Sequence, residues 1–262
     1  MSSLASSLPH SLNRTVRMRA TPATVFGFFT NSAQWASWWG AGSSIDALVG
    51  GSVRICYPGG INVLGTVLEI SAPHRLVFTY GFESGTPIAA GTSRVTITVA
   101  PDPVGTLLSL THEFAEPDAA VRDGHVQGWR YQLSIFANLT ANAQHADAAR
   151  VVDAWFDAWA DPHVDSRSAT FTRIASPGIL FGDRYSSLES LPDLLAHVTA
   201  TQHYMPGIRM TRAGEVRHCQ GMVLADFTAA SADGTPVMRG TNVFVFAPSG
   251  MLESVTGFSG LP

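Results

Sequence analysis

Lysine is absent from the 262 residues, so all sixteen basic side chains are arginine. Without lysine, the chain cannot form a Schiff base with a carbonyl substrate or with pyridoxal phosphate, and it cannot build a phosphate-binding loop around a lysine. Only 14% of the residues are charged, against about 25% in an average soluble domain, and the formal net charge is −4. Because a nucleic-acid groove needs a basic stripe, we expect no nucleic-acid partner.

Cysteine is nearly absent as well. Cys56 and Cys219 lie far apart in the chain, which excludes a closely spaced zinc motif and predicts free thiols in a reducing compartment. The nine histidines are scattered, so we expect no bound metal. Neither a Gly-x-Ser-x-Gly elbow nor a Gly-x-Gly-x-x-Gly loop is present, which disfavours nucleophilic catalysis and dinucleotide binding. We therefore expect no cofactor.

Long apolar runs are also missing. No run reaches the roughly 18 residues that a membrane-spanning helix needs. Residues 1–10 do not show the basic stretch followed by an apolar run that marks a secretory signal. The sequence therefore predicts a cytoplasmic protein with no membrane partner.

Two stretches of helix and strand signals meet near residues 141–148. In the first, Thr21 and Pro22 are typical of a helix start, because proline costs little where the backbone N–H is unpaired anyway. Val95, Ile97 and Val99 alternate with polar residues, which indicates a half-buried antiparallel strand. We predict helices from residue 22, over 32–39 and over 118–140, and strands over 11–19, 52–57, 62–70, 75–82, 93–100 and 106–114.

In the second stretch, Val152, Trp155, Phe156 and Trp159 recur with a helical period. We predict helices over 147–160 and 191–204, and strands over 178–181, 208–213 with 216–228, 237–246 and 252–258. Residues 163 and 165 are expected in a solvated loop. Each half would then pack helices on an antiparallel sheet. The predicted fold class is α+β, with domains at residues 1–143 and 144–262.

The order and spacing of motifs in the first half carry a family resemblance. They are Thr21-Pro22-Ala23-Thr24-Val25-Phe26, Trp35 to Trp39, Gly50-Gly51, Gly65 to Ile70, Arg75 to Tyr80, Gly105 to His112 and Gly128-Trp129. Residues 15–140 resemble the bacterial family similar to the activator of the heat-shock-protein-90 ATPase, within the START-like, or SRPBCC, superfamily. This resemblance implies a helix-grip fold around a hydrophobic pocket. The superfamily includes lipid carriers and cyclases.

The second half carries a different resemblance. Val152 to Trp159, Phe181 to Tyr185, Gly240 to Phe244 and Val255 to Phe258 are similar to segments of the nuclear-transport-factor-2-like fold. The nearest group is that of the SnoaL-like polyketide cyclases and ketosteroid isomerases. The resemblance implies a cone of curved antiparallel sheet and helices around a pocket, and a homodimer, because many members pair through the sheet. The isomerases' catalytic tyrosine with two acids is not cleanly reproduced.

Aromatic and histidine side chains are the candidate ligand-binding groups of the first half. The predicted ligand-binding residues are Trp35, Trp38, Trp39, Phe78, Tyr80, His112 and Trp129. The tryptophans either anchor a short helix on the sheet or line a pocket for a planar apolar molecule. His112 is either a buried neutral histidine that donates to a carbonyl or a group that contacts the ligand. His125 is expected at a mouth or surface position.

Polar residues near the predicted inner face of the second half are the candidate catalytic groups. They are Asp226, His218 and Asp183, with Asn242 and Phe244 as ligand-binding residues. Among apolar neighbours Asp226 would have a raised pKa suited to acid/base catalysis. Alternatively, its strand face is the outer one, or it pairs with Arg239. Asp183 either pairs with Arg184 at a turn or faces the pocket as a base.

Three functions compete. The first is a two-domain protein that binds a small hydrophobic or aromatic molecule in one or both pockets. The second is a cyclase, isomerase or dehydratase that works by acid/base catalysis without a cofactor. The third is a co-chaperone, as the name of the first resembled family implies. The eukaryotic co-chaperones of that name carry an additional N-terminal domain that these residues lack, so a chaperone partner is disfavoured.

Overall fold

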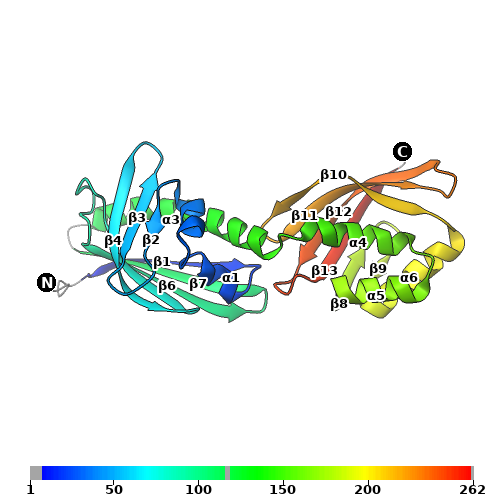
Figure 1. The fold of residues 1–262 in the computed structure, drawn as a ribbon, viewed down its shortest axis with the longest axis horizontal. Coiled ribbons are helices and arrows are strands. Elements are labelled where there is room, and N and C mark those ends of the chain that lie inside the picture. Colours follow the sequence, from blue (N-terminus) through cyan, green and yellow to red (C-terminus); the bar gives the residue numbers. More distant parts are fainter. Residues whose placement is uncertain (1–7, 116–118, 261–262) are drawn as a thin grey trace. The chain divides into compact units, whose positions relative to one another are not determined.

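The computed structural model describes residues 8–115 and 119–260. The chain divides into two compact units, unit 1 with residues 1–141 and unit 2 with residues 142–262. Each unit packs helices on a sheet (Figure 1), so the predicted two-domain α+β fold is confirmed. The predicted boundary lies two residues beyond the division that the contacts give.

Unit 1 is built on a seven-stranded antiparallel sheet. Its elements are β1 (His10–Met18), α1 (Pro22–Gly27), α2 (Ser32–Trp39), β2 (Ser44–Ile45), β3 (Ser52–Tyr57), β4 (Ile61–Ser71), β5 (Arg75–Tyr80), β6 (Ser93–Asp102), β7 (Gly105–Phe114) and α3 (Ala119–Gln144). The strand order is β1-β7-β6-β5-β4-β3-β2. The sheet is strongly curved, so that β3 and β4 run across β6 and β7 in Figure 1.

Side-chain caps fix where the two short helices of unit 1 begin. The Thr21 hydroxyl accepts a hydrogen bond from the backbone N–H of Thr24 at 3.2 Å, and Pro22 follows as the first helical residue. The Asn31 carboxamide oxygen accepts from the N–H groups of the second and third residues of α2. Such caps satisfy backbone donors that a helix start leaves unpaired. Both predicted helix starts are confirmed.

The strands of unit 1 alternate between a buried and a solvated face. In β6, Val95, Ile97 and Val99 are buried, as predicted. In β7, Leu110 and His112 are buried on the same side of the sheet. Because successive side chains of a strand point to opposite faces, the core of unit 1 lies on one side of this sheet.

Unit 2 is built on a six-stranded sheet. Its elements are α4 (Ala148–Ala160), α5 (Val164–Ile174), β8 (Ala175–Gly182), β9 (Ser187–Leu188), α6 (Leu191–Tyr204), β10 (Arg209–Cys219), β11 (Met222–Ala230), β12 (Pro236–Phe246) and β13 (Leu252–Gly260). The strand order is β10-β11-β12-β13-β8-β9. The pairing of β13 with β8 is parallel, so the prediction of a purely antiparallel sheet is wrong there. The chain between β8 and β13 passes through a helix and three other long strands, which allows this parallel return.

Two further predictions for unit 2 are wrong. The predicted strand over 216–228 is two strands, because the chain turns at Gln220 and Gly221, whose φ angles are 50° and 81°. Positive φ at both central residues is the geometry of a tight hairpin turn. Residues 163 and 165 do not lie in a loop: His163 precedes α5, and Asp165 lies in the first turn of that helix. A carboxylate there complements the helix dipole.

Candidate functional site

A cavity of about 490 Å³ lies in unit 2 between α4, α6 and the inner face of the sheet. Its walls are mainly aromatic and sulfur-containing, and they include Trp155, Trp159, Phe181, Phe227, Met210 and Met238. The volume falls within the range of small-molecule sites, about 300–1,000 Å³. We call this space the unit 2 cavity.

Asn242 on β12 brings an unsatisfied amide to the unit 2 cavity. Its side chain lines the cavity and is only 5% exposed. Its amide makes no hydrogen bond to the described residues, and neither amide atom is among their fully enclosed unpaired atoms, so the amide is open to the cavity. The predicted inward face of this strand, which Asn242 shares with Met238 and Phe244, is observed.

Asp183 reaches the same cavity from the end of β8. The Tyr185 N–H donates to Asp183 Oδ1 at 2.8 Å, and the Asp183 N–H donates to the Ser186 carbonyl at 3.0 Å. No donor in the described part of the chain reaches Asp183 Oδ2. Arg184 does not pair with Asp183: its guanidinium lies 5.0 Å from the centre of the Tyr185 ring. The turn therefore holds one carboxylate oxygen and leaves the other available beside the cavity.

Gly257 on β13 leaves a gap between these two polar groups. A Cβ on this residue would lie 3.1 Å from Asn242 Oδ1 and 3.4 Å from Asp183 Cβ. All three residues line the unit 2 cavity. The missing side chain therefore opens a small notch with the amide on one side and the aspartate on the other. We call it the Gly257 notch.

His197 on α6 is a cavity residue that sequence reasoning missed. Its Nε2 and the Ser186 hydroxyl lie 3.1 Å apart in a hydrogen bond, and its ring packs near Trp159 and Phe181. Leu194, three residues earlier on α6, is fully buried. Helical spacing from that leucine could have placed His197 on the inner face. The bond to Ser186 ties the Asp183 turn to α6.

The other two predicted catalytic residues lie outside the cavity. Asp226 is on the outer face of β11, where Arg217 donates to both carboxylate oxygens at 3.0 Å and the Thr241 hydroxyl donates at 2.5 Å. Its side chain is 48% exposed. His218 is on the opposite face, and its Nε2 accepts the Gly221 N–H at 3.2 Å. The structure therefore does not bring Asp226, His218 and Asn242 together, which removes the geometric basis for the predicted roles of Asp226 and His218.

Phe244 lies in the core of unit 2 rather than on the cavity wall. It is fully buried and packs edge-on against Trp155 and Phe156. Phe244 affects the cavity only indirectly, because it packs against Trp155, which lines the cavity. Replacing it would change packing before it changed any contact with a ligand.

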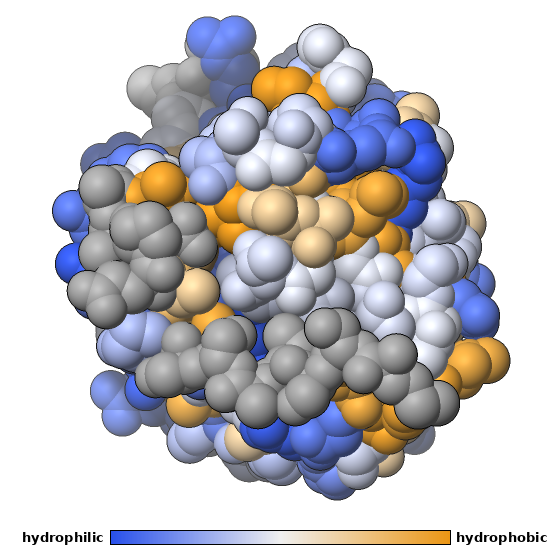
Figure 2. All heavy atoms as spheres, turned by 90° about the vertical axis from the view of Figure 1, so that its left-hand side faces the viewer, coloured by the Kyte–Doolittle hydropathy of each residue, from blue (hydrophilic) through white to orange (hydrophobic). Residues whose placement is uncertain are grey.

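Unit 1 holds a second cavity of about 690 Å³, which we call the unit 1 cavity. Trp38 and Trp39 of α2, Tyr80 of β5, and His125 and Gln132 of α3 contribute to its wall. Apolar side chains also reach the outer surface of this unit, as Figure 2 shows for the end seen at the left of Figure 1. The prediction that Trp38, Trp39 and Tyr80 border a pocket agrees with this geometry, and His125 lies at the predicted mouth-like position.

The remaining aromatic candidates of unit 1 belong to its core. Trp35 and Phe78 are fully buried and pack edge to face, and Trp35 Nε1 donates to the Arg54 carbonyl at 3.1 Å. Trp129 is buried on α3 and does not line the cavity. These three side chains hold α2 and α3 against the sheet. This is the first of the two roles considered for the tryptophans, in which they anchor a helix on the sheet.

His112 lies in a continuous series of hydrogen bonds that runs from Trp129 to the backbone of Tyr80. Trp129 Nε1 donates to His112 Nδ1 at 3.1 Å, so the ring proton must be on Nε2, which donates to the Ser93 hydroxyl at 2.8 Å. Ser93 donates in turn to the Tyr80 carbonyl at 2.8 Å. Burial, helped by the nearby His125, holds the pKa of His112 well below its ordinary value. His112 is therefore a neutral group that joins the sheet to α3.

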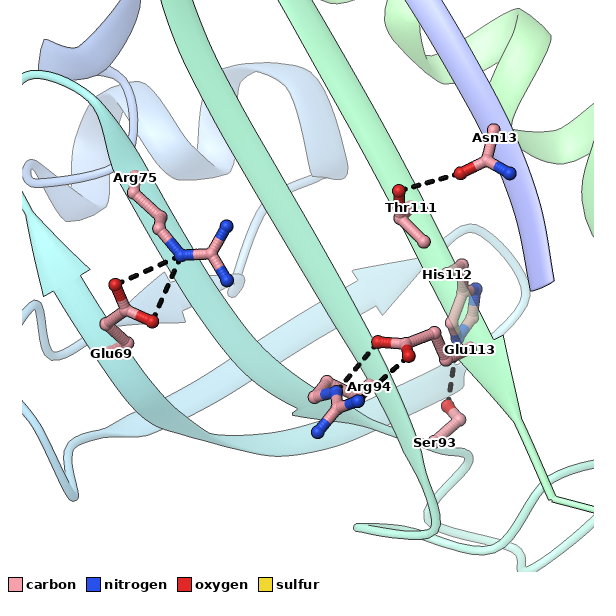
Figure 3. Close-up of polar contacts among 8 residues, drawn as sticks. All are labelled: Asn13, Glu69, Arg75, Ser93, Arg94, Thr111, His112 and Glu113. Atoms are coloured by element: carbon pink, nitrogen blue, oxygen red, sulfur yellow. Dashed lines mark hydrogen bonds and ion pairs between the residues drawn. The ribbon is translucent and has the colours of Figure 1, made fainter. Parts of the chain in front are cut away.

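Figure 3 shows the hydrogen bond between Ser93 and His112 and, on the other face of the sheet, the ion pair between Arg94 and Glu113. Glu113, the residue after His112, projects to the other face, where Arg94 donates to both of its carboxylate oxygens at 2.8 Å. This ion pair lowers the pKa of Glu113 and raises that of Arg94. The hydrogen bonds of His112 and the ion pair of Glu113 therefore lie on opposite faces of the sheet.

Tyr80 also has a polar partner inside unit 1. Its hydroxyl lies 3.4 Å from the hydroxyl of Tyr57, which also lines the cavity. Burial raises the pKa of Tyr57, and it raises the pKa of Tyr80 well above its ordinary value. Both phenols therefore stay neutral donors and acceptors at the wall of the unit 1 cavity.

Residues 19–141 match the family of Activator of Hsp90 ATPase homolog 1-like proteins. The resemblance predicted for the first half is thereby confirmed. Among curated proteins, none matches the chain. Within the described part of the chain, no helix is long and apolar enough to cross a membrane, and no three His, Cys, Asp or Glu side chains are placed to hold a metal ion.

Several solved structures are similar to parts of the chain. A putative isomerase of the SnoaL-like family from Agrobacterium tumefaciens is 21% identical, covering 45% of this chain and 98% of its own, with a TM-score of 0.42. An AHSA1-like protein from Rhizobium etli is 28% identical, covering 51% and 84%, with a TM-score of 0.42. The Aha1 dimer from Colwellia psychrerythraea is 15% identical, covering 48% and 92%, with a TM-score of 0.41.

The neutral state of His112 predicts a pH dependence of stability. The unfolded chain, with an ordinary histidine pKa of 6.5, binds a proton at pH values where folded His112 does not. The stabilisation is therefore complete above about pH 6.5 and is lost as the pH falls below that value. We expect the free energy of unfolding to fall between about pH 7 and pH 5, and His112→Gln to flatten this dependence, in urea titrations followed by tryptophan fluorescence.

The matched control for this prediction is His74→Gln. His74 is exposed in the turn between β4 and β5, so its loss should leave the pH dependence as in the wild type. Equal pH dependence in the wild type and in His112→Gln would contradict the assignment.

Proposed function

We propose that the protein binds small apolar or aromatic molecules, with the unit 2 cavity as the main site. The observation that carries this proposal is the amide of Asn242, which is buried, faces the cavity and has no protein partner among the described residues. Aromatic walls supply contact area, and one amide supplies orientation, which is the usual composition of a small-molecule site. A ligand that hydrogen-bonds to Asn242 would offset the cost of burying it.

The unit 1 cavity supports a second ligand site in the same proposal. The indole rings of Trp38 and Trp39, 4.1 Å apart between centroids, offer a broad apolar surface. Tyr57 and Tyr80 add neutral hydroxyl groups at the same wall. A planar molecule with one polar group fits this wall. A homodimer and a cytoplasmic location stay predictions of the sequence, and activation of a chaperone ATPase stays the disfavoured alternative.

A cofactor-independent acid/base enzyme is the second candidate. It is favoured by one observation, that the Asp183 carboxylate and the His197 imidazole both line the unit 2 cavity. A carboxylate can accept a proton from carbon next to a carbonyl and return it at another position of the same enolate, while an imidazole N–H within reach donates a hydrogen bond to the enolate oxygen. Proton transfer of this kind underlies isomerisation, cyclisation and dehydration. Asp183 was the predicted base, and His197 takes the place that His218 was expected to fill.

Filling the unit 2 cavity tests the binding proposal. Gly257 lines the cavity, and its backbone is not in the left-handed region, so Gly257→Leu directs a side chain into the space without backbone strain. We expect this change to weaken binding of a neutral naphthalene derivative, 2-naphthylmethanol, by at least about tenfold in isothermal titration calorimetry.

The matched control is Gly178→Leu in the same sheet. A Cβ at Gly178 would meet nothing within 4 Å, and the residue is exposed. This variant should bind the probe as the wild type does. Unchanged affinity in Gly257→Leu would contradict the assignment of the unit 2 cavity as the main site.

Hydrogen exchange tests the enzyme candidate without a known substrate. In heavy water, the wild type is expected to accelerate deuterium incorporation next to the carbonyl of 2-tetralone, measured by proton NMR. Asp183→Asn should remove the acceleration, because the amide cannot accept the proton. Asp226→Asn, on the outer face, should retain it. Acceleration that survives in Asp183→Asn, or that is missing in the wild type, would rule out Asp183 as a base for this chemistry.

A further inference from the structure

The negative charge of the chain is concentrated in one unit. Residues 142–262 hold eight arginines and twelve aspartates and glutamates, whereas residues 1–141 hold eight of each. The whole formal charge of −4 therefore belongs to unit 2. A unit with this balance attracts cations and repels anions from solution.

Two side chains of opposite formal charge line the unit 2 cavity, Asp183 and Arg184. Asp183 has no ion-pair partner within 4.0 Å among the described residues, in contrast to Asp153, which pairs with Arg212 at 2.7 Å. The nearest cation in sequence, Arg184, is exposed and lies over the Tyr185 ring at the cavity wall. The Asp183 carboxylate thus borders an apolar space without a neutralising partner.

Asn242 and Asp183 both line the cavity beside the Gly257 notch. Asn242 Oδ1 lies 3.1 Å from the place that a Cβ of residue 257 would take, Asp183 Cβ lies 3.4 Å from it, and the Gly182 carbonyl oxygen lies 3.9 Å from it. An ammonium group has three N–H donors and no acceptor, so it can donate to the amide oxygen and to Asp183 Oδ2 together. Hydrogen bonds to a charged partner are stronger than those between neutral groups.

The other walls of the cavity suit the apolar part of a molecule that carries an ammonium group. Trp155, Trp159 and Phe181 present aromatic surface to the cavity, and ring faces attract a nearby cation as well as an apolar skeleton. His197 of α6 also lines the cavity and is hydrogen-bonded to Ser186. Arg184, a cation at the cavity wall, lies over the Tyr185 ring and forms no ion pair with Asp183.

We propose that the unit 2 cavity selects hydrophobic primary amines, with the ammonium group in the Gly257 notch between Asp183 and Asn242. This inference rests on the proposed function and adds the charge of the ligand to it. The aromatic or alkyl part lies against the tryptophans, and the charged group donates to the aspartate and to the amide oxygen.

Three probes that share one ring system separate charge from shape. They are 2-naphthylmethylamine, which is a cation at neutral pH, 2-naphthylmethanol, which is neutral, and 2-naphthoate, which is an anion. Calorimetry with the full chain is expected to show the amine binding at least about tenfold more tightly than the alcohol, with the naphthoate weakest. Added salt should weaken binding of the amine and leave the alcohol unchanged.

Two variants that each remove one carboxylate test whether Asp183 is the group that binds the ammonium. Asp183→Asn should lower the affinity for the amine by about tenfold or more, and change the affinity for the alcohol by less than about twofold. Asp226→Asn removes the same charge from the outer face of the same sheet, and it should leave both affinities unchanged. Circular dichroism checks that both variants are folded.

The outcomes test selectivity for amines separately from the proposed binding of small molecules. Equal binding of amine and alcohol, tighter binding of naphthoate, or an amine affinity that Asp183→Asn does not change would overturn the inference and leave small-molecule binding standing. Binding of none of the three probes would overturn the proposed function together with the inference.

Discussion

The alternation of side chains along each strand decides which groups enter the cavities of this protein. A strand that buries one face sends every second residue inward, and the residue beside it outward. His112 and Asn242 are inward, and their neighbours Glu113 and Thr241 are outward. Because the alternation is fixed by backbone geometry, each inward polar group takes its hydrogen-bond partner from its own unit, from water or from a ligand.

Inner polar groups meet this requirement in two ways. His112 is satisfied on both ring nitrogens, by Trp129 and by Ser93. Asn242 has no such partner among the described residues, and its amide is open to the unit 2 cavity. At the unit 1 cavity, the side-chain N–H groups of Trp38, Trp39 and Gln132 are likewise without partners among the described residues. A polar group of this second kind can take its partner from a ligand.

The sequence predicted the fold and much of unit 1 because the local signals there agree. Thr21 with Pro22 and the alternation around Val95 specify a helix start and a strand face without tertiary information. The strand of Asn242 was also assigned to the correct face, which it shares with the large rings of Phe244 and Phe246. Core and pocket roles of the tryptophans could not be separated, since both environments select large apolar rings.

The acid/base hypothesis put Asp226 on the inner face, and the alternative outer face is the one observed, for a definable reason. The hairpin turn at Gln220 and Gly221 puts His218 opposite Val223, so even-numbered residues before the turn share a face with odd-numbered residues after it. Missing that turn reverses every orientation beyond it. His197 was missed because a helix shows its inner face only once a buried neighbour such as Leu194 is known. Asp183 lies beside the Gly257 notch because β8 and β13 pair in parallel. No local sequence pattern predicts this pairing between strands that are far apart in the chain.

The most direct test of a ligand at Asn242 is NMR of its side-chain amide, identified by the loss of its two proton signals in Asn242→Leu. During titration with a naphthalene probe that calorimetry shows to bind, these signals should shift and saturate with the same dissociation constant. Amide signals of Asn242 that stay unchanged while the probe saturates the protein would contradict the account.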